Sequence, residues 1–336
     1  MKIAVDAMGG DFAPKNVIEG AKLALQEFPS IEQILLVGDT DAISQEMATH
    51  DFQWRRTTVI HASQVVDMGD KAAQSVRAKR DSSISVAIDL AKKGEADAVV
   101  SIGHTGAAVA AATVKLRTLE GVDRPGIASP LPNEHGVCNI LDAGANVDAK
   151  PLHLLHYAFM GDVYARHVLG VDNPAIGLMS VGEEDDKGND FTRETFSLLK
   201  ETSLNFIGNV EGHDLFESPV DVILCDGFIG NVILKSCEAT AKAMSKWLKL
   251  EMQRSPLRVL GASMAVGAFR AIKHRTSYES VGGSPLLGIN GTVIIGHGSS
   301  SAVAIKNAIR AAGEAIEHKV NPLIEEAIRD HCQVHA

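Results

Sequence analysis

Polar side chains suited to binding a small anion stand where a short apolar run meets a helical pattern near the C-terminus. They follow the apolar run 292–295, precede an Ala-rich helix expected over 302–312, and comprise His297, Gly298, Ser299, Ser300 and Ser301. Serine amides and hydroxyls at the positive N-terminus of a helix form a natural anion site. Simple N-capping by serine is the alternative interpretation. A Ser–His nucleophile pair is less favoured, because adjacent residues rarely hold the required geometry and no orienting acid is evident.

Lys187 is a second candidate, because it is a cation in a loop of acidic residues and glycine. The residues around it are Glu183, Glu184, Asp185 and Asp186 before it and Gly188-Asn189 after it. Contiguous carboxylates could hold a metal ion, but such a run is more often a solvated turn. We therefore predict no metal site here.

The four cysteines form no recognisable reactive or metal-binding pair. Cys138, Cys225, Cys237 and Cys332 are scattered without a CxxC spacing, so neither a disulfide framework nor a zinc site is expected, and a reducing cytosol fits. Cys225 could be a thiol nucleophile, but its position at the end of a predicted strand favours a buried side chain.

An alternating pattern of strands and helices must position these residues. Strands are predicted over 2–7, 34–37, 98–102, 137–141, 175–179, 220–224 and 292–295, with amphipathic or Ala-rich helices between them. Such alternation is typical of right-handed βαβ units and predicts an α/β fold with a mainly parallel sheet. With 336 residues, 45% of them hydrophobic, the chain can form one large domain or two lobes.

Ligands of an open parallel sheet bind beyond the carboxyl ends of its strands, so the loops at those ends define the expected cleft. Besides Lys187 and residues 297–300, these loops carry Asp6, Gly9, Gly10, Asp11, His104, Thr105, Gly106, Asn146, Asp226 and Asn231. Any one such loop is more often an ordinary turn, but several at one edge of a sheet predict a cleft.

Several functions are disfavoured by what the sequence contains or lacks. A net charge of −10 argues against nucleic acid as the main partner. No GxGxxG follows a predicted strand, and neither a GxxxxGK[ST] loop nor a GxSxG elbow is present. Asp6 interrupts any apolar signal segment, and the longest apolar run, 260–269, is too short to span a bilayer.

The segment 252–278 reverses the acidic balance of the chain, because it contains five cations and no acidic residue around an apolar centre at 257–269. We expect it to protrude as helices that contact an acidic carrier protein or an anionic bilayer. The residues expected at that contact are Arg254, Arg258, Leu260, Val266, Arg270, Lys273 and Arg275. A subunit interface with a solvated basic edge is the alternative. Arg77, Lys79 and Arg80 form a second, smaller basic patch.

Taken in order, these loops resemble the PlsX family of phosphate acyltransferases over nearly the whole chain. The matching motifs are Asp6-Ala7-Met8-Gly9-Gly10-Asp11-Phe12-Ala13-Pro14, Leu141-Asp142-Ala143-Gly144-Ala145-Asn146, Val181-Gly182-Glu183-Glu184 with Lys187-Gly188-Asn189, Gly208-Asn209-Val210-Glu211-Gly212, Cys225-Asp226-Gly227-Phe228 with Gly230-Asn231-Val232, Gly282-Gly283-Ser284-Pro285-Leu286-Leu287-Gly288 and His297-Gly298-Ser299-Ser300. Each motif alone is weak, but together in this order they are highly specific. Two positions depart from the usual family pattern: His104 stands where Asn is usual, and Ser284 where Ala is common.

The resemblance implies a three-layer α/β/α fold like that of isocitrate and isopropylmalate dehydrogenases, related to phosphotransacetylase. It implies one catalytic domain over residues 1–336, which could divide into two lobes. The implied reaction converts acyl-acyl carrier protein and inorganic phosphate into acyl phosphate and free carrier protein, the first step of bacterial phospholipid synthesis. The resemblance further implies a cytoplasmic homodimer without metal or organic cofactor. It would contact the inner face of the plasma membrane peripherally and be linked functionally to a membrane-bound glycerol-3-phosphate acyltransferase.

Within that reaction phosphate is itself the nucleophile, so no acyl-enzyme residue is needed. We hypothesise that Lys187 neutralises charge on phosphate or on the developing oxyanion, and that Asn231 donates a hydrogen bond to one of those groups. Residues 297–300 would hold phosphate at the helix N-terminus. The remaining polar cleft residues, Asp6, Asp11, Asn146 and Asp226, are expected to organise loops rather than carry protons.

Three other functions stay open at this point. An NAD(P)-dependent dehydrogenase could use the same architecture, because a fold does not determine a function. A phosphotransacetylase-like enzyme would use a short acyl-CoA as donor. A non-catalytic membrane scaffold for lipid enzymes would bind vesicles without releasing a thiol from the acyl carrier.

Overall fold

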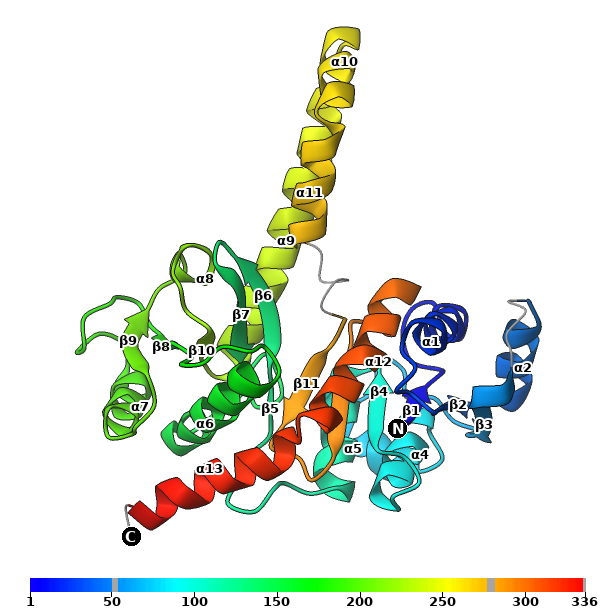
Figure 1. Cartoon of the computed structure of the whole chain (residues 1–336), viewed down its shortest axis with the longest axis horizontal. Coiled ribbons are helices and arrows are strands. Elements are labelled where there is room, and N and C mark those ends of the chain that lie inside the picture. Colours follow the sequence, from blue (N-terminus) through cyan, green and yellow to red (C-terminus); the bar gives the residue numbers. More distant parts are fainter. Residues whose placement is uncertain (50–53, 277–281, 335–336) are drawn as a thin grey trace.

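The computed structural model describes residues 1–49, 54–276 and 282–334 and is organised around two β-sheets (Figure 1). Among these residues the first sheet has seven strands in the order β3-β2-β1-β4-β12-β11-β5. Their bounds are β1 (Lys2–Asp6), β2 (Gln33–Gly38), β3 (Thr57–His61), β4 (Ala98–Ser101), β5 (Gly126–Ile127), β11 (Ser284–Leu287) and β12 (Thr292–Ile295). Neighbouring strands from β3 to β12 are parallel, whereas β11 is antiparallel to both β12 and β5. The loops that follow β1, β4 and β12 therefore leave the same edge of the sheet.

Helices cover both faces of this first sheet. Ile3 and Val5 of β1 pack with α1 (Lys15–Glu27) and α12 (Ala302–Glu317), whereas Ala4 packs with α4 (Ser83–Lys92) and α5 (Thr105–Lys115). Because both faces of β1 are buried, the strand is a continuous apolar run rather than an alternating one. Two further helices, α2 (Thr40–Thr49) and α3 (Ala72–Ala78), pack against α1 and α5, and a short 3-10 helix, η1 (Trp54–Arg56), precedes β3. This half has the three layers that the family resemblance implied.

The second sheet has five strands among the described residues, in the order β6-β7-β10-β8-β9. They are β6 (Ser129–Asn133), β7 (Gly136–Leu141), β8 (Ile176–Met179), β9 (Phe206–Val210) and β10 (Val222–Leu224). All neighbouring pairs are parallel except β6 with β7. One face is covered by α6 (Pro151–His167) together with α7 (Asp190–Lys200) and α13 (Val320–Val334), and α8 (Asp214–Glu217) packs near β6.

Helix α6 shows how thoroughly this second core is buried. Thirteen of its residues are buried, including Tyr157 at its centre. Gly161 faces β10, where an added Cβ would lie 2.6 Å from the Val222 side chain, so the helix approaches the sheet closely. Close packing of this kind fixes the strands whose ends carry the polar loops.

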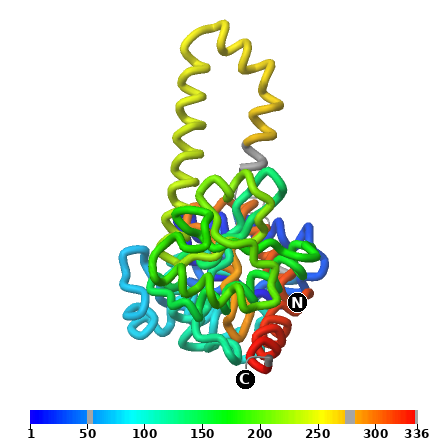
Figure 2. The backbone as a smooth tube through the Cα atoms, turned by 90° about the vertical axis from the view of Figure 1, so that its left-hand side faces the viewer, coloured from blue at the N-terminus to red at the C-terminus, as the bar shows by residue number. Residues whose placement is uncertain are grey.

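Three helices extend away from both sheets: α9 (Gly227–Met252), α10 (Pro256–Met264) and α11 (Val266–Thr276). Figure 2 shows α9 leaving the body and the chain returning beside it through α10 and α11. The buried residues of α9 are Gly227 and Gly230 at its beginning, and α10 has none. None of the helices over the described ranges is long and apolar enough to cross a membrane.

The predicted α/β fold with mainly parallel strands is confirmed, and each predicted strand corresponds to an observed one whose ends differ by at most two residues. The pattern did not predict β3, β5, β6, β9 or β11, nor the division of the strands into two sheets. Short strands such as Gly126–Ile127 carry too few residues for a periodic signal.

Candidate active site

Two loops of the first sheet are tied together at the N-terminus of α12. The Asp11 amide donates to the Gly298 carbonyl at 2.8 Å, and the Asn16 side chain donates to the Ser300 carbonyl at 3.0 Å. Gly10 has φ +93°, and a Cβ there would lie 2.9 Å from the Gly298 oxygen. Only glycine therefore fits at this crossing. The structure thus brings the predicted residues after β1 and after β12 into direct contact.

Asp6 joins the loop after β1 to the end of β4. Its carboxylate is buried, accepts a hydrogen bond from the Ser101 hydroxyl at 2.8 Å and faces Gly9, where a Cβ would lie 2.8 Å away. Burial raises the pKa of Asp6, and hydrogen bonds from Ser83 and Ser101 act against that rise. Asp6 is enclosed by the loops that it connects, so its geometry fits the organising role that the sequence predicted.

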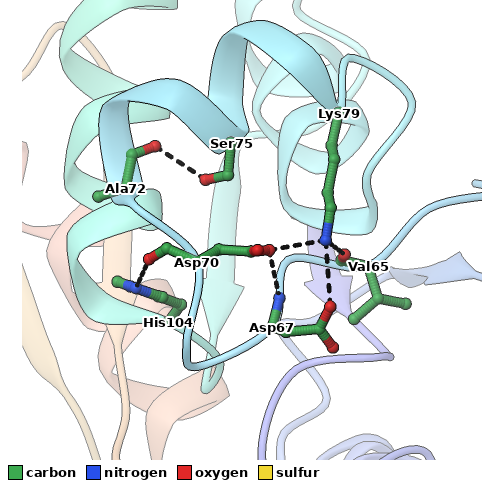
Figure 3. A network of polar contacts seen from close by, with 7 residues as sticks. All are labelled: Val65, Asp67, Asp70, Ala72, Ser75, Lys79 and His104. Carbon is green, nitrogen blue, oxygen red and sulfur yellow. Dashed lines mark hydrogen bonds and ion pairs between the residues drawn. The ribbon is translucent and has the colours of Figure 1, made fainter.

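His104 fixes the loop that covers this part of the sheet edge (Figure 3). Its Nδ1 accepts from the Ala107 amide at 3.2 Å as the N-cap of α5, so its Nε2 carries the hydrogen and donates to the Asp70 carbonyl at 3.0 Å. Thr105 and Gly106 form the first turn of α5. A small cavity lies beneath the covering loop, lined by Asp6, Val65, Ser83, Ser101 and His104 among others.

Lys79 holds the other side of that covering loop (Figure 3). Its ammonium group donates to the Val65 carbonyl at 2.8 Å and pairs with Asp67 at 3.1 Å and Asp70 at 2.6 Å. The bond to Lys79 lowers the pKa of Asp70 and, in turn, raises that of Lys79. The basic patch expected at residues 77–80 is therefore weakened, because one of its three cations is occupied within the chain.

In the second sheet, Asp142 organises the loop after β7. Its buried carboxylate accepts from the amides of Asn146 at 2.6 Å, Ala145 at 2.9 Å and Gly144 at 3.0 Å. It also accepts from the Ile127 amide of β5 at 2.9 Å, which joins the two sheets. Burial raises the pKa of Asp142, and these four amides oppose the rise. The sequence placed Asp142 in a strand-end motif but gave it no role of its own, although Asp, Gly and Asn together are a recognisable turn signal.

Asn146 connects that loop to two helices. Its side chain contacts His153 Nδ1 at 3.1 Å near the start of α6, and its carbonyl accepts from the Gly227 amide at 2.9 Å at the start of α9. The same His153 nitrogen lies 3.0 Å from the Lys150 amide. Burial lowers the pKa of His153, which favours the neutral ring that can accept these bonds.

The start of α9 lies directly on the Asp142 loop. Asp226 caps the helix by accepting from the Ile229 amide at 2.9 Å. A Cβ on Gly230 would overlap the Asp142 carbonyl oxygen, so the close approach requires glycine. Asn231 follows on the exposed side, and a Cβ on Gly144 would lie 3.6 Å from its Cβ. The helix start thus presents the Asn231 amide above the loop.

Lys187 lies in the exposed loop after β8, the strand next to β10. Its amide donates to the Glu184 carbonyl at 3.0 Å, which closes a turn. Over the described residues its ammonium group forms no ion pair, and Asp185 pairs with Lys200 at 2.5 Å instead. The preceding carboxylates therefore leave Lys187 available to a ligand. No hydrogen bond of the described residues joins its side chain to Asn231 or to residues 297–300.

Potential metal ligands come together beside this loop, although not as a contiguous acidic run. Ligand atoms of Glu183, His213 and Asp214 lie within 4.8 Å of one another. His213 Nε2 is 3.8 Å from Glu183 and 3.6 Å from Asp214, distances that ion pairing with a protonated imidazole also explains. Asp214 is held by the Ser218 hydroxyl and the Glu211 amide, so it has a role in the turn itself.

One contact crosses from the second sheet's helix to the first sheet's loop. Lys235 of α9 lies 2.8 Å from His297 Nε2, and His297 Nδ1 lies 2.8 Å from Ser299 Oγ. Burial, and then the charge of Lys235, lowers the pKa of His297. Sequence reasoning missed Lys235. The available signal was its position one helical turn after Asn231, which places both residues on one side of α9.

Two of the four cysteines, Cys138 and Cys225, are buried in or beside strands of the second sheet. Cys225 is buried at the end of β10, and its thiol points to the Asp142 carbonyl at 3.6 Å. Burial is the main cause that raises the pKa of Cys225, and the same holds for Cys138. A raised pKa disfavours the nucleophilic thiolate, in agreement with a buried strand cysteine.

The extension α9–α11 carries exposed apolar side chains between its charges. Leu260 is 59% exposed and Val266 is 44% exposed. Arg254 and Arg258 both pair with Glu251, at 2.9 and 3.0 Å, so part of the basic charge is balanced by an acidic residue just before the predicted segment. Arg270 is exposed. The side chains of Lys273 and Arg275 lie outside the described part of the chain, as do residues 277 and 278 of the predicted segment.

A family model described as "Fatty acid synthesis protein" matches residues 1–323. A phosphate acyltransferase of Akkermansia muciniphila is 56% identical over 332 residues, covering 97% of this chain and 95% of that relative. One of Geotalea uraniireducens is 52% identical, covering 98% and 95%.

Solved structures with a similar fold are more distant in sequence. A phosphotransacetylase of Streptococcus pyogenes has a TM-score of 0.61 at 18% identity and covers 94% of both chains. A branched-chain phosphotransacylase of Enterococcus faecalis has a TM-score of 0.58 at 13% identity, covering 95% of this chain and 99% of the other. At such low identity these similarities concern the fold.

Proposed function

Because the chain belongs to the fatty acid synthesis protein family, whose closely similar relatives are named phosphate acyltransferase, we propose that it transfers a fatty acyl group from acyl carrier protein to inorganic phosphate. The products are acyl phosphate and free acyl carrier protein, which makes this the first step of phospholipid synthesis. The observation that carries the proposal is that strand-end loops of the first sheet and helix α9 of the second sheet meet at the N-terminus of α12, where Asp11 contacts Gly298 and Lys235 contacts His297.

The reaction requires a phosphate oxygen to attack the thioester carbonyl carbon. A carbon–oxygen bond forms, the carbon–sulfur bond breaks, and the carrier's sulfur leaves as a thiolate that takes up a proton. Holding phosphate beside the thioester replaces a bimolecular encounter by a near-attack complex, an effect of about 7–11 kcal/mol at best. No residue of the chain needs to form a covalent intermediate, which fits the raised pKa values of the buried thiols.

The α12 N-terminus supplies the phosphate site in this proposal. Ser299 and Ser300 stand before the helix cap Ser301, where backbone N–H groups concentrate positive potential. The Ser300 hydroxyl is buried and has no hydrogen-bond partner among the described residues, so it can donate to a bound oxygen. An anion therefore fits this position better than a neutral ligand.

Lys187 and Asn231 complete the proposed reaction site from the second sheet. Lys187 neutralises charge on phosphate or on the oxyanion that develops at the thioester carbonyl, and Asn231 donates a hydrogen bond to one of these groups. An oxyanion donor contributes about 3–4 kcal/mol of transition-state stabilisation in comparable sites. Lys187 lies in the loop after β8 and Asn231 in the helix after β10, the neighbouring strand, and both residues are exposed to an entering ligand.

We further propose that the enzyme is a cytoplasmic homodimer that touches the inner face of the plasma membrane through α10 and α11. Exposed apolar side chains flanked by Arg254, Arg258 and Arg270 support an anionic bilayer as the partner surface. Such contact would bring acyl phosphate to a membrane-bound glycerol-3-phosphate acyltransferase. Vesicle flotation tests the membrane contact, and analytical ultracentrifugation tests the dimer.

The reaction is tested by supplying purified acyl-acyl carrier protein with and without inorganic phosphate and measuring free thiol. We expect thiol release that depends on phosphate and is accompanied by acyl phosphate. Release that is independent of phosphate would contradict the proposal. Replacing the donor by short acyl-CoA distinguishes a phosphotransacetylase, and adding NAD or NADP with absorbance detection distinguishes a dehydrogenase. Vesicle binding without any thiol release would instead indicate a scaffold.

A further inference from the structure

Lys235 of α9 reaches the proposed phosphate loop of the other sheet, where Glu238 of the same helix also lies 3.6 Å from His297 Nε2. Its ammonium nitrogen lies 2.8 Å from His297 Nε2 and 3.3 Å from Glu238 Oε2. It stands four residues after Asn231, so the two side chains are neighbours on the helix surface. The same stretch of helix thus presents an amide to the Asp142 loop and a cation to the loop at residues 297–300.

The hydrogen-bond geometry leaves Lys235 with capacity for a ligand. A lysine ammonium has three N–H donors. Over the described part of the chain, His297 and Glu238 are its two partners, so one donor remains. The side chain is 53% exposed, so a small ion can reach it. Glu238 balances the charge of the lysine without surrounding it.

The contacts of His297 suit a neutral ring that orients the donors of Lys235 and Ser299. They do not suit a protonated ring that would itself bind the anion as a cation. To accept from the Lys235 ammonium, Nε2 must lack a hydrogen, so the neutral ring carries its hydrogen on Nδ1. That hydrogen then faces Ser299 Oγ at 2.8 Å, and the Ser299 hydroxyl keeps its own hydrogen for another acceptor. The Ser299 amide points at the same Nδ1 from 3.2 Å, but Nδ1 accepts that bond only in the other tautomer. With Nε2 accepting from Lys235, the Ser299 N–H is therefore left for a bound anion.

We propose that Lys235 binds the phosphate substrate and that His297 is the positioning residue that holds its ammonium group beside Ser299. This inference rests on the proposed function, because it places phosphate at the start of α12. A cation, a helix N-terminus and unused hydroxyl donors at one point select a multiply charged anion. Lys235 is then a second cation at the phosphate, in addition to Lys187. Helix α9 becomes a direct link between the two sheets at the reaction site.

A purely structural link between the sheets predicts a different outcome from a phosphate ligand. A structural Lys235 would affect thermal stability and both substrates alike. A phosphate-binding Lys235 affects the KM for phosphate and leaves the KM for acyl-acyl carrier protein unchanged. The split between the two constants therefore decides between these roles.

The experiment uses the full chain and compares Lys235→Met, Lys235→Arg and the control Lys246→Met. Lys246 is an exposed cation farther along α9. Initial rates of thiol release are measured with phosphate varied at saturating acyl-acyl carrier protein, and then the reverse. We expect Lys235→Met to raise the KM for phosphate at least tenfold with less than a twofold change in the KM for the carrier. Lys235→Arg should fall between Lys235→Met and the wild type, and Lys246→Met should match the wild type.

A binding measurement without turnover accompanies the kinetics. Inorganic phosphate should raise the melting temperature of the wild type and of Lys246→Met, because a ligand that binds only the folded state stabilises it. Lys235→Met should lose most of that rise. His297→Ala should behave like Lys235→Met, whereas His297→Gln, which keeps an acceptor for the ammonium, should stay within threefold of the wild-type KM for phosphate.

The results separate this inference from the proposed function. If the wild type releases thiol only with phosphate, but Lys235→Met keeps its KM for phosphate within twofold, the function stands and the role of Lys235 is refuted. Equal losses toward both substrates would refute it as well. If the wild type neither needs phosphate nor gains stability from it, the proposed function fails and the inference fails with it.

Discussion

The two ends of α9 lie in opposite environments although they belong to one continuous helix. At its beginning, Gly227 and Gly230 are buried against the Asp142 loop, and Lys235 contacts His297 of the other sheet. Farther along, Trp247 is 63% exposed, and α10 has no buried residue at all. The first end is defined by close contacts within the chain, and the second by apolar side chains that remain exposed.

Under the proposed function, this difference separates the residues proposed to shape the reaction site from the residues proposed to meet a partner. At the cleft end, the two buried positions are glycines because helix and loop must approach each other, whereas Phe228 beside them is exposed. At the distal end, large apolar side chains and cations remain on the surface, a composition that suits a second copy or a bilayer. The same glycine-to-alanine substitution should therefore disturb the structure at the beginning of α9 and be tolerated in α10.

The largest contrast is expected from adding a methyl group to a glycine at each end. In Gly230→Ala the new Cβ overlaps the Asp142 carbonyl, so the start of α9 must shift, at a cost of about 3 kcal/mol in unfolding free energy. Acyl phosphate formation should fall at least a hundredfold, because the shift displaces Asn231. Activity assays and urea denaturation of the purified variant measure both effects.

Gly261→Ala is the matched control in α10. A Cβ there meets nothing within 4 Å, and alanine favours a helix by about 1 kcal/mol over glycine. Activity in solution should stay at the wild-type level. Equal damage from the two substitutions would mean that the cleft end of α9 is not specially constrained.

A second test removes functional groups without disturbing the packing. Lys187→Ala and Asn231→Ala should each lower turnover at least tenfold while leaving the melting temperature unchanged, because both side chains are exposed. Stopped-time assays of thiol release and a thermal scan are sufficient. Near-wild-type turnover in both variants would remove these residues from the reaction site.

A third test addresses the distal end. Leu260→Glu combined with Val266→Glu should weaken binding to vesicles of anionic phospholipid at least fivefold, since charge replaces apolar surface. Turnover with soluble substrates should not change. Flotation of both proteins with anionic and with zwitterionic vesicles measures the effect. Undiminished binding by the double variant would exclude this surface as the membrane contact.

The smallest effect is expected from pH, through histidines at the cleft end. Burial lowers the folded-state pKa of His153, so the unfolded chain takes up a proton first as the pH falls below about 6.5. The stability that the neutral ring provides is present above that pH and is lost as the pH falls toward the lower folded pKa. The urea midpoint should therefore be lower at pH 5.5 than at pH 7.5. In His153→Gln the decrease should be smaller, and an unchanged decrease would assign it to other groups.

The sequence predicted those features that depend on local pattern. The strands over residues 2–6, 98–101 and 292–295 are marked by apolar runs, and their polar ends identified the loops that meet at Gly298. The apolar and basic composition of 252–278 likewise pointed to an unusual surface. Such features depend on residues that are neighbours in the sequence, so a single sequence is enough to predict them.

Features that depend on contacts between residues far apart in the sequence were not predicted. The two sheets are joined by contacts such as that of the Ile127 amide with Asp142, and the role proposed for Lys235 rests on its contact with His297. Asp142 and Lys235 do not differ in residue type from many other residues of the chain. Which Asp is enclosed by four amides, or which Lys faces a histidine across the cleft, is set by tertiary packing and not by local pattern.

The central claim is that strand-end loops from both sheets enclose one phosphate ion. A crystal of the full chain soaked in inorganic phosphate tests it most directly. We predict phosphate at the N-terminus of α12, within hydrogen-bonding distance of Ser299 or Ser300 and contacted by Lys187 or Lys235. Phosphate bound elsewhere, with none at that helix start, would contradict the account.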